Sequence, residues 1–115
     1  MARGRERFGV YCTPCHGFTG EGDGMISKRV AAIKERNDYK GSWVAPTDLN
    51  QESVRAQTVG QLFNTITNGI GSMPSYGAQI TPQDRWSIIL YLRALQRSRA
   101  ATPADVEPAE RANLK

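Results

Sequence analysis

The sequence predicts an all-α domain of three to five helices, and three observations support this fold class. Apolar residues recur with helical spacing in residues 3–11, 58–68 and 81–97. The last two of these stretches open with residues that cap helix N-termini. Glycine and proline punctuate the segments between them. At 115 residues, the length fits one domain.

A five-residue motif, Cys12-Thr13-Pro14-Cys15-His16, carries most of the chemistry of the chain. It has the form C-x-x-C-H, the attachment signature of a c-type haem. Two thiols three residues apart can add to the two vinyl groups of one porphyrin, and the adjacent imidazole then ligates the iron. The motif predicts one haem c, covalent through Cys12 and Cys15, with His16 as a metal ligand.

Three other interpretations of the motif are weaker. A redox dithiol of the thioredoxin type should follow a strand in a βαβ unit, whereas this motif follows a polar, helix-like segment. A structural zinc site needs four ligands, and the chain has only Cys12, Cys15 and His16, with no second pair. A disulfide would close a loop too short to constrain much of the unfolded chain.

Composition agrees with a bound apolar group. Hydrophobic residues make up 39% of the chain, which is low for a self-sufficient core. A porphyrin would supply apolar surface for side chains to pack around. The net charge of +4 is spread without a run of five or six like charges, so nucleic acid is not an expected partner.

The sequence also bears on location. The longest apolar run, residues 88–92, is too short to span a bilayer, and the first residues lack the apolar region of a secretory signal. Haem attachment to this motif normally happens outside the cytoplasm. We therefore expect a mature or trimmed fragment of a protein that matures outside the cytoplasm, with any leader and membrane anchor missing from it.

Residues 3–11 are expected to form the first helix. Gly4, Phe8 and Cys12 fall four apart and so share one face. Glycine on such a face permits close approach of another helix. We expect Phe8 to belong both to the core and to the haem wall.

Residues 17–24 contain four glycines and are expected to form a loop. A phosphate loop is excluded, because G-x-G-x-x-G is absent and no strand precedes the segment. Two carboxylates, Glu21 and Asp23, make only a weak case for calcium. Residues 25–36 show modest helical periodicity, with a basic face towards solvent.

Residues 37–57 read as a loop carrying Trp43, Pro46 and Leu49. A loop with a tryptophan usually wraps something apolar, and the haem is the obvious candidate. A proximal imidazole usually donates its Nδ1–H to a nearby acceptor. The carbonyl of Pro46 is the candidate acceptor.

Residues 58–68 are expected to form a helix that Thr58 and Gln61 open with a capping box. Its apolar stripe is Leu62, Phe63 and Ile66, and Asn68-Gly69 ends it.

The following loop, residues 69–77, is bracketed by glycines and contains Met73-Pro74. A thioether in such a loop, well downstream of the haem motif, is better read as the distal iron ligand than as core packing. Met25, or a sixth position that is vacant or otherwise filled, is the alternative. His16 is the only histidine, so two-histidine ligation within the chain is excluded.

Residues 81–97 give the clearest helix, with Thr81 as cap, Pro82 in the first turn and Asp84 at the third position. Two apolar rows follow, and we expect them to pack on the N-terminal helix and on the haem side. The rows are Trp86, Ile89 and Leu90, and Ile88, Tyr91, Leu92 and Leu95. Residues 102–115 are polar and read as a tail, extended over the surface or mobile. The expected division is a haem domain over 1–100 and a tail over 101–115.

Taken together, these motifs resemble class I cytochrome c over about residues 3–97. The shared features are the Gly4/Phe8 helix with C-x-x-C-H, Pro46 and Leu49, Met73-Pro74, and the Trp86/Tyr91-Leu92 helix. The resemblance implies helices around one haem, with the N- and C-terminal helices packed together, and His16 and Met73 as iron ligands. The expected haem-binding residues are Cys12, Cys15, His16, Phe8, Trp43, Pro46, Leu49, Phe63, Met73 and Tyr76.

A narrower resemblance is to the monohaem cytochrome subunit of bacterial alternative complex III, a quinol-oxidising respiratory complex. It lies in residues 7–12 (RFGVYC), 22–26 (GDGMI), 61–69 (QLFNTITNG) and 85–89 (RWSII). That family's subunit is tethered to the membrane, often by lipid. No lipidation cysteine precedes Cys12 here, so a tether is implied by the resemblance alone.

The expected function is one-electron transfer rather than catalysis, with redox proteins as partners: subunits of a quinol-oxidising complex as donor, and an oxygen reductase or soluble cytochrome as acceptor. A cytochrome domain of a terminal oxidase, or a free periplasmic cytochrome, is the alternative. A haem sensor or peroxidase with a labile sixth ligand is the rival from another class.

Overall fold

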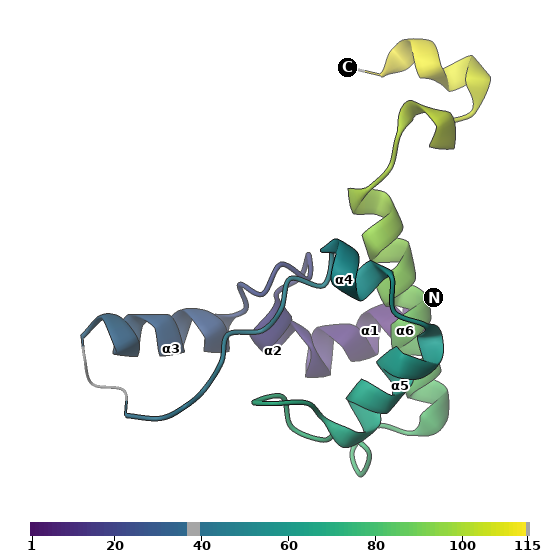
Figure 1. Ribbon diagram of the computed structural model, residues 1–115. Helices are drawn as coiled ribbons and strands as arrows, with labels where there is room; N and C mark the ends of the chain where they lie inside the picture. Colours follow the sequence, from purple (N-terminus) through teal and green to yellow (C-terminus); the bar gives the residue numbers. More distant parts are fainter. Residues whose placement is uncertain (37–39, 115) are drawn as a thin grey trace.

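A computed structural model describes residues 1–36 and 40–114 of the chain. The order of its elements is shown in Figure 1. The α-helices are α1 (Ala2–Tyr11), α2 (Thr13–His16), α3 (Met25–Glu35), α4 (Glu52–Arg55), α5 (Val59–Asn68) and α6 (Pro82–Arg99). Two 3₁₀ helices, η1 (Pro103–Asp105) and η2 (Pro108–Asn113), follow. The described residues contain one isolated β-bridge, between Ile70 and Met73, and no strand. The all-α prediction is confirmed.

The four longer helices begin and end within two residues of their predicted bounds. Both predicted caps are present: Thr58 and Gln61 form the reciprocal capping box of α5, and the Thr81 hydroxyl accepts from Asp84 N. The short helices α2 and α4 were not predicted, because four residues are too few to show periodicity. Of the loop predicted over residues 37–57, residues 37–39 lie outside the described residues.

The tail differs from the expectation of an extended segment. It forms the short helices η1 and η2, and in Figure 1 it projects away from the end of α6 instead of running over the surface. Local hydrogen bonds explain the turns, because Asp105 and Thr102 form a capping box around η1.

The packing of α1 on α6 joins the two ends of the domain, as predicted. Gly4 lies so close to α6 that a Cβ atom there would fall 1.9 Å from the Ser87 carbonyl oxygen. One helical turn further on, the rings of Phe8 and Tyr91 lie 5.2 Å apart. Arg3 Nε donates to Asp84 at 2.9 Å, and this hydrogen bond holds the pKa of the Asp84 carboxyl below its usual range.

The core lies where α1, α5 and α6 meet, with Val54 of α4 and Ile80 added at its edges. Of the two apolar rows predicted on α6, only the row of Ile88, Tyr91, Leu92 and Leu95 packs against this core throughout. Ile88, Ile89 and Leu92 are buried, whereas Trp86 and Leu90 are 46% and 53% exposed. The apolar pattern of α6 covers more of its circumference than its neighbours bury.

The remaining elements frame the motif. In Figure 1, α3 extends away from the α1–α6 crossing, and the segment after it returns past α2 towards α4. None of the helices in the described residues combines the length and the hydropathy needed to cross a membrane.

Candidate haem site

The haem-attachment motif is folded as one helical turn. Cys12 is the N-cap residue of α2, and its carbonyl oxygen accepts from His16 N at 2.8 Å. Cys12, Cys15 and His16 therefore occupy positions i, i+3 and i+4, which share one helix face. The two thiols and the imidazole face the same side because the backbone is helical there.

The two cysteines do not form a disulfide. Burial raises the pKa of the Cys12 thiol to about 12, with a smaller contribution from Cys15, and burial also raises the pKa of Cys15. A redox dithiol of the thioredoxin type depends on a lowered thiol pKa. The environment of this pair therefore opposes that alternative.

The imidazole of His16 is oriented by one hydrogen bond. Its Nδ1 lies 3.2 Å from the carbonyl oxygen of Thr47. A carbonyl can only accept, so Nδ1 carries the proton and Nε2 is left to bind a metal. Burial lowers the pKa of His16, and the Thr47 carbonyl partly opposes the shift.

The acceptor predicted from the sequence, the Pro46 carbonyl, is wrong by one residue. That carbonyl faces the glycine loop instead, where a Cβ atom on Gly22 would lie 2.7 Å from it. A loop without periodicity gives no register, so the sequence could identify the segment but not the carbonyl.

The glycine loop and α3 hold α2 from the other side. Gly22 N donates to the His16 carbonyl at 2.8 Å, and the Ser27 hydroxyl donates to the Cys15 carbonyl at 2.7 Å. At Gly24 a Cβ atom would lie 2.3 Å from the Pro14 carbonyl oxygen. The glycines of this loop thus allow close backbone approach.

The two carboxylates considered for calcium do not form a cluster. The Glu21 carboxylate pairs with Arg99. Across residues 1–36 and 40–114, no group of three or more His, Cys, Asp or Glu side chains could hold a metal ion together. Neither the calcium nor the zinc alternative gains support.

The loop that carries Met73 is closed on itself. Met73 N donates to the Ile70 carbonyl at 2.8 Å, and Ile70 N donates to the Met73 carbonyl at 3.1 Å. Val44 N also donates to the Ser72 hydroxyl at 2.9 Å. This hydrogen bond connects the Met73 loop to the segment that contains Thr47, whose carbonyl orients His16.

Three of the side chains expected at the haem wall pack against the core together with Cys12. These side chains, Leu49, Phe63 and Tyr76, are half-buried. Burial raises the pKa of Tyr76, and Cys15 and Cys12 raise it further, so this phenol lies near both thiols. The Tyr76 ring also meets Tyr11 edge-on, with centroids 6.1 Å apart.

The two remaining residues expected at the haem wall, Phe8 and Trp43, have the following neighbours. Phe8 is 2% exposed and contacts Tyr91 of α6, which places it in the core. Trp43 lies beside α3, where Lys34 Nζ donates to its carbonyl at 3.0 Å and sits 6.0 Å from its ring centroid.

The donor set fits a haem c. It comprises a thiol pair and an imidazole on one helix face, an imidazole nitrogen directed by a carbonyl, and a thioether in a closed loop. Cys12 and Cys15 would hold the porphyrin covalently, and His16 would supply a nitrogen ligand to its iron.

Sequence reasoning missed Arg85, a charged residue that is 7% exposed. The signal was present: residues 85, 88, 89, 92 and 96 follow the i, i+3, i+4, i+7 pattern of a buried helix face. A search of this face for apolar residues alone does not include an arginine.

Comparison with known families identifies a match over most of the chain. The family described as cytochrome c oxidase, cbb3-type, subunit III matches residues 1–92, from α1 to the buried Leu92 of α6. Comparison with the curated proteins finds no match.

Proposed function

The chain belongs to the cytochrome c family of the cbb3-type oxidase subunit III kind, and from that premise we propose a one-electron carrier whose haem iron is ligated by His16 and Met73. Family membership implies a covalent haem c, for which Cys12 and Cys15 provide the attachment motif, and redox proteins as partners.

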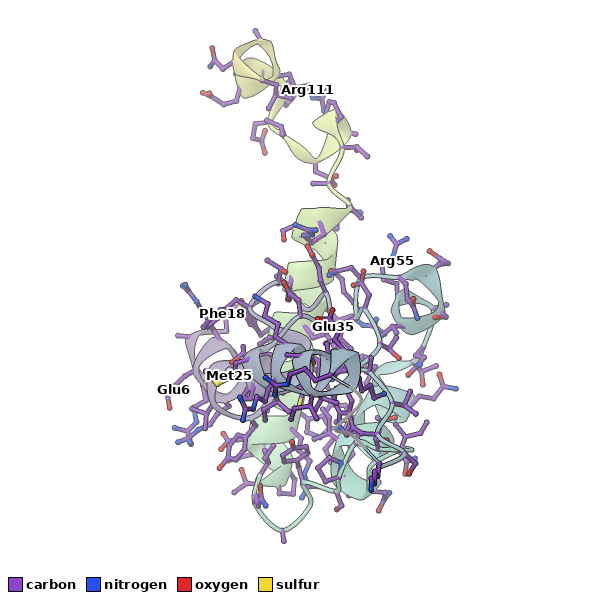
Figure 2. All side chains as sticks on the ribbon, turned by 90° about the vertical axis from the view of Figure 1, so that its left-hand side faces the viewer. Glu6, Phe18, Met25, Glu35, Arg55 and Arg111 are labelled. Carbon is purple, nitrogen blue, oxygen red and sulfur yellow. The ribbon has the colours of Figure 1, made fainter. Side chains whose placement is uncertain are left out.

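The proposal rests on a hydrogen bond that joins the Met73 loop to the segment that orients His16. Thr47 orients His16, and three residues earlier Val44 binds Ser72, the neighbour of Met73. The rival thioether, Met25, is 76% exposed, and Figure 2 shows it at the outer surface of the molecule. The two segments thus favour Met73 over Met25 as the sixth ligand.

The chemistry follows from these donors. When bound, the haem supplies reversible one-electron oxidation of iron, and thioether ligation raises its reduction potential. The chain contributes by holding both ligands in place. If His16 and Met73 both stay bound in the two oxidation states, little rearrangement would accompany electron transfer, and no position would be left open to oxygen or peroxide.

We further propose that the domain is anchored in a membrane respiratory assembly on the periplasmic side. The four stretches that resemble the alternative complex III cytochrome, residues 7–12, 22–26, 61–69 and 85–89, support a quinol-oxidising complex. The family match supports the oxidase alternative. Co-purification with a tagged full-length protein separates them, because each predicts a different set of partner subunits.

The test of ligation is Met73→Ala in the haem-loaded protein, with Met25→Ala as matched control. We expect Met73→Ala to lower the reduction potential, abolish the red-region sulfur-to-iron absorption band of the ferric protein, and let the ferrous protein bind carbon monoxide. Met25→Ala should retain the wild-type potential and band. The opposite pattern would assign the ligand to Met25. A band that is unchanged in both variants would show that neither Met73 nor Met25 is the sixth ligand.

A further inference from the structure

We propose that Arg85 is a positioning residue for the Met73 thioether, a buried guanidinium that fixes the returning half of the Met73 loop, residues 74–80, between α5 and α6. The inference rests on the proposed ligation of iron by Met73. It concerns a side chain that contacts neither proposed ligand.

The guanidinium of Arg85 binds three acceptors in two parts of the chain. Nε donates to the Ile80 carbonyl at 2.9 Å and Nη2 donates to the Gly77 carbonyl at 2.8 Å, both in the returning half of the loop. Nη1 donates to the Thr67 hydroxyl of α5 at 3.1 Å. The planar guanidinium carries its N–H donors in a fixed fork, so one rigid group can hold all three acceptors at once.

Thr67 extends this contact to the residues next to Met73. Its hydroxyl donates to the Phe63 carbonyl at 2.7 Å, and its own carbonyl accepts from the Ser75 hydroxyl at 2.5 Å and from Gly77 N at 3.2 Å. Ser75 lies two residues after Met73. The bonds between Ile70 and Met73 close the other side of the loop, so little freedom remains for the backbone at Met73.

The buried guanidinium of Arg85 is stabilised by hydrogen bonds to neutral groups. Within residues 1–36 and 40–114, no carboxylate forms an ion pair with it. Its partners are two carbonyls, a hydroxyl and the ring of Phe63, whose centroid lies 5.2 Å from Cζ. A buried cation is costly unless it is fully hydrogen-bonded. Any shift of residues 77–80 would break that set, so the cation opposes movement of the loop.

The experiment uses the haem-loaded full chain with Arg85→Lys, which keeps the charge and removes the fork. The matched control is Arg93→Lys, because Arg93 also lies on α6 and also donates to backbone carbonyls, those of Arg55 and Gln57. The readouts are the red-region band during denaturant titration, the helical circular dichroism, and the rate at which imidazole binds the ferric protein.

We expect Arg85→Lys to lose the band at a lower denaturant concentration than it loses its helices, and to bind imidazole roughly tenfold faster than wild type. Losing one hydrogen bond of ordinary net strength changes an equilibrium by about that factor. Arg93→Lys should lose the band and the helical signal at the same denaturant concentration. It should bind imidazole at the wild-type rate. If Arg85→Lys instead loses the band and the helical signal at the same denaturant concentration, with an unchanged rate of imidazole binding, the role of Arg85 is merely structural.

A second variant covers the case in which Arg85→Lys does not fold. Thr67→Val removes one acceptor and leaves the guanidinium in place, and we expect the same early loss of the band to a smaller extent. If the foldable variants keep the band until the helices unfold, Arg85 does not position Met73, although Met73 can still be the ligand. If the wild-type ferric protein has no such band, the proposed ligation itself fails.

Discussion

At the scale of single residues, the backbone of Gly69 shapes the loop that presents Met73. Its φ of 77° and ψ of 174° belong to a region that only glycine adopts readily. A Cβ atom there would also lie 2.5 Å from the Met73 carbonyl oxygen. The residue that ends α5 therefore also sets the conformation of the loop after it.

We expect Gly69→Ala to destabilise the protein by of order 1–3 kcal/mol from backbone strain, and further through the clash with Met73. Gly71→Ala is the control, because Gly71 also has a positive φ, 53°, but nothing lies within 4 Å of its Cβ position. Denaturant titration followed by the red-region band measures both variants. Equal effects of the two substitutions would contradict the close contact at Gly69.

The individual residues of the site were only partly predictable. The local motif gave Cys12, Cys15 and His16 directly, because their chemistry depends on sequence spacing alone. The partner of His16 was misplaced by one residue, from Thr47 to Pro46, because loop register depends on contacts that are distant in sequence. Helix periodicity could have identified Arg85 as buried, but not its partners, because the neutral acceptors at residues 67, 77 and 80 show no charge pattern in the sequence.

At the scale of helices, the α1–α6 crossing organises the domain. Phe8 packs against Tyr91, and Gly4 allows the α1 backbone to approach the Ser87 carbonyl. The spacing of Gly4 and Phe8, four residues apart, predicted this contact face. The short helices α2 and α4 had no such signal, since their geometry is imposed by the neighbouring segments.

We expect Gly4→Ala to destabilise the protein by about 1–3 kcal/mol, because a methyl group cannot fit without moving α1 away from α6. Gly9→Ala on the same helix should stabilise it by about 0.5–1 kcal/mol, since nothing lies within 4 Å of that Cβ position and alanine is the better helix former. Chemical denaturation of the two haem-loaded variants measures the difference. A stabilising Gly4→Ala would contradict the close crossing.

At the scale of the whole molecule, the buried apolar side chains gather at one crossing of helices, and the motif lies beside it with half-buried aromatic neighbours. This arrangement fits a domain that completes its core around a haem. The family match ends at residue 92, and the tail projects away from the helices in Figure 1. We propose that residues 1–100 form the haem domain and that residues 101–115 are an appendage.

Removal of residues 101–115 tests this division. The contact of the tail with α6 includes the ion pair of Asp105 with the mostly exposed Arg97, and exposed pairs contribute about 0–1 kcal/mol. We therefore expect the truncated protein to keep its spectrum and to lose no more than about 1 kcal/mol of unfolding free energy. A loss of haem incorporation on truncation would make the tail part of the domain.

The most direct measurement for the account as a whole is a visible redox titration of the isolated, haem-loaded chain with and without carbon monoxide. An iron atom held by His16 and Met73 predicts a single one-electron transition whose midpoint carbon monoxide does not shift at neutral pH. A midpoint that rises in carbon monoxide, or a new ferrous spectrum, would show an open sixth position and contradict the electron-carrier assignment in favour of a haem sensor or peroxidase.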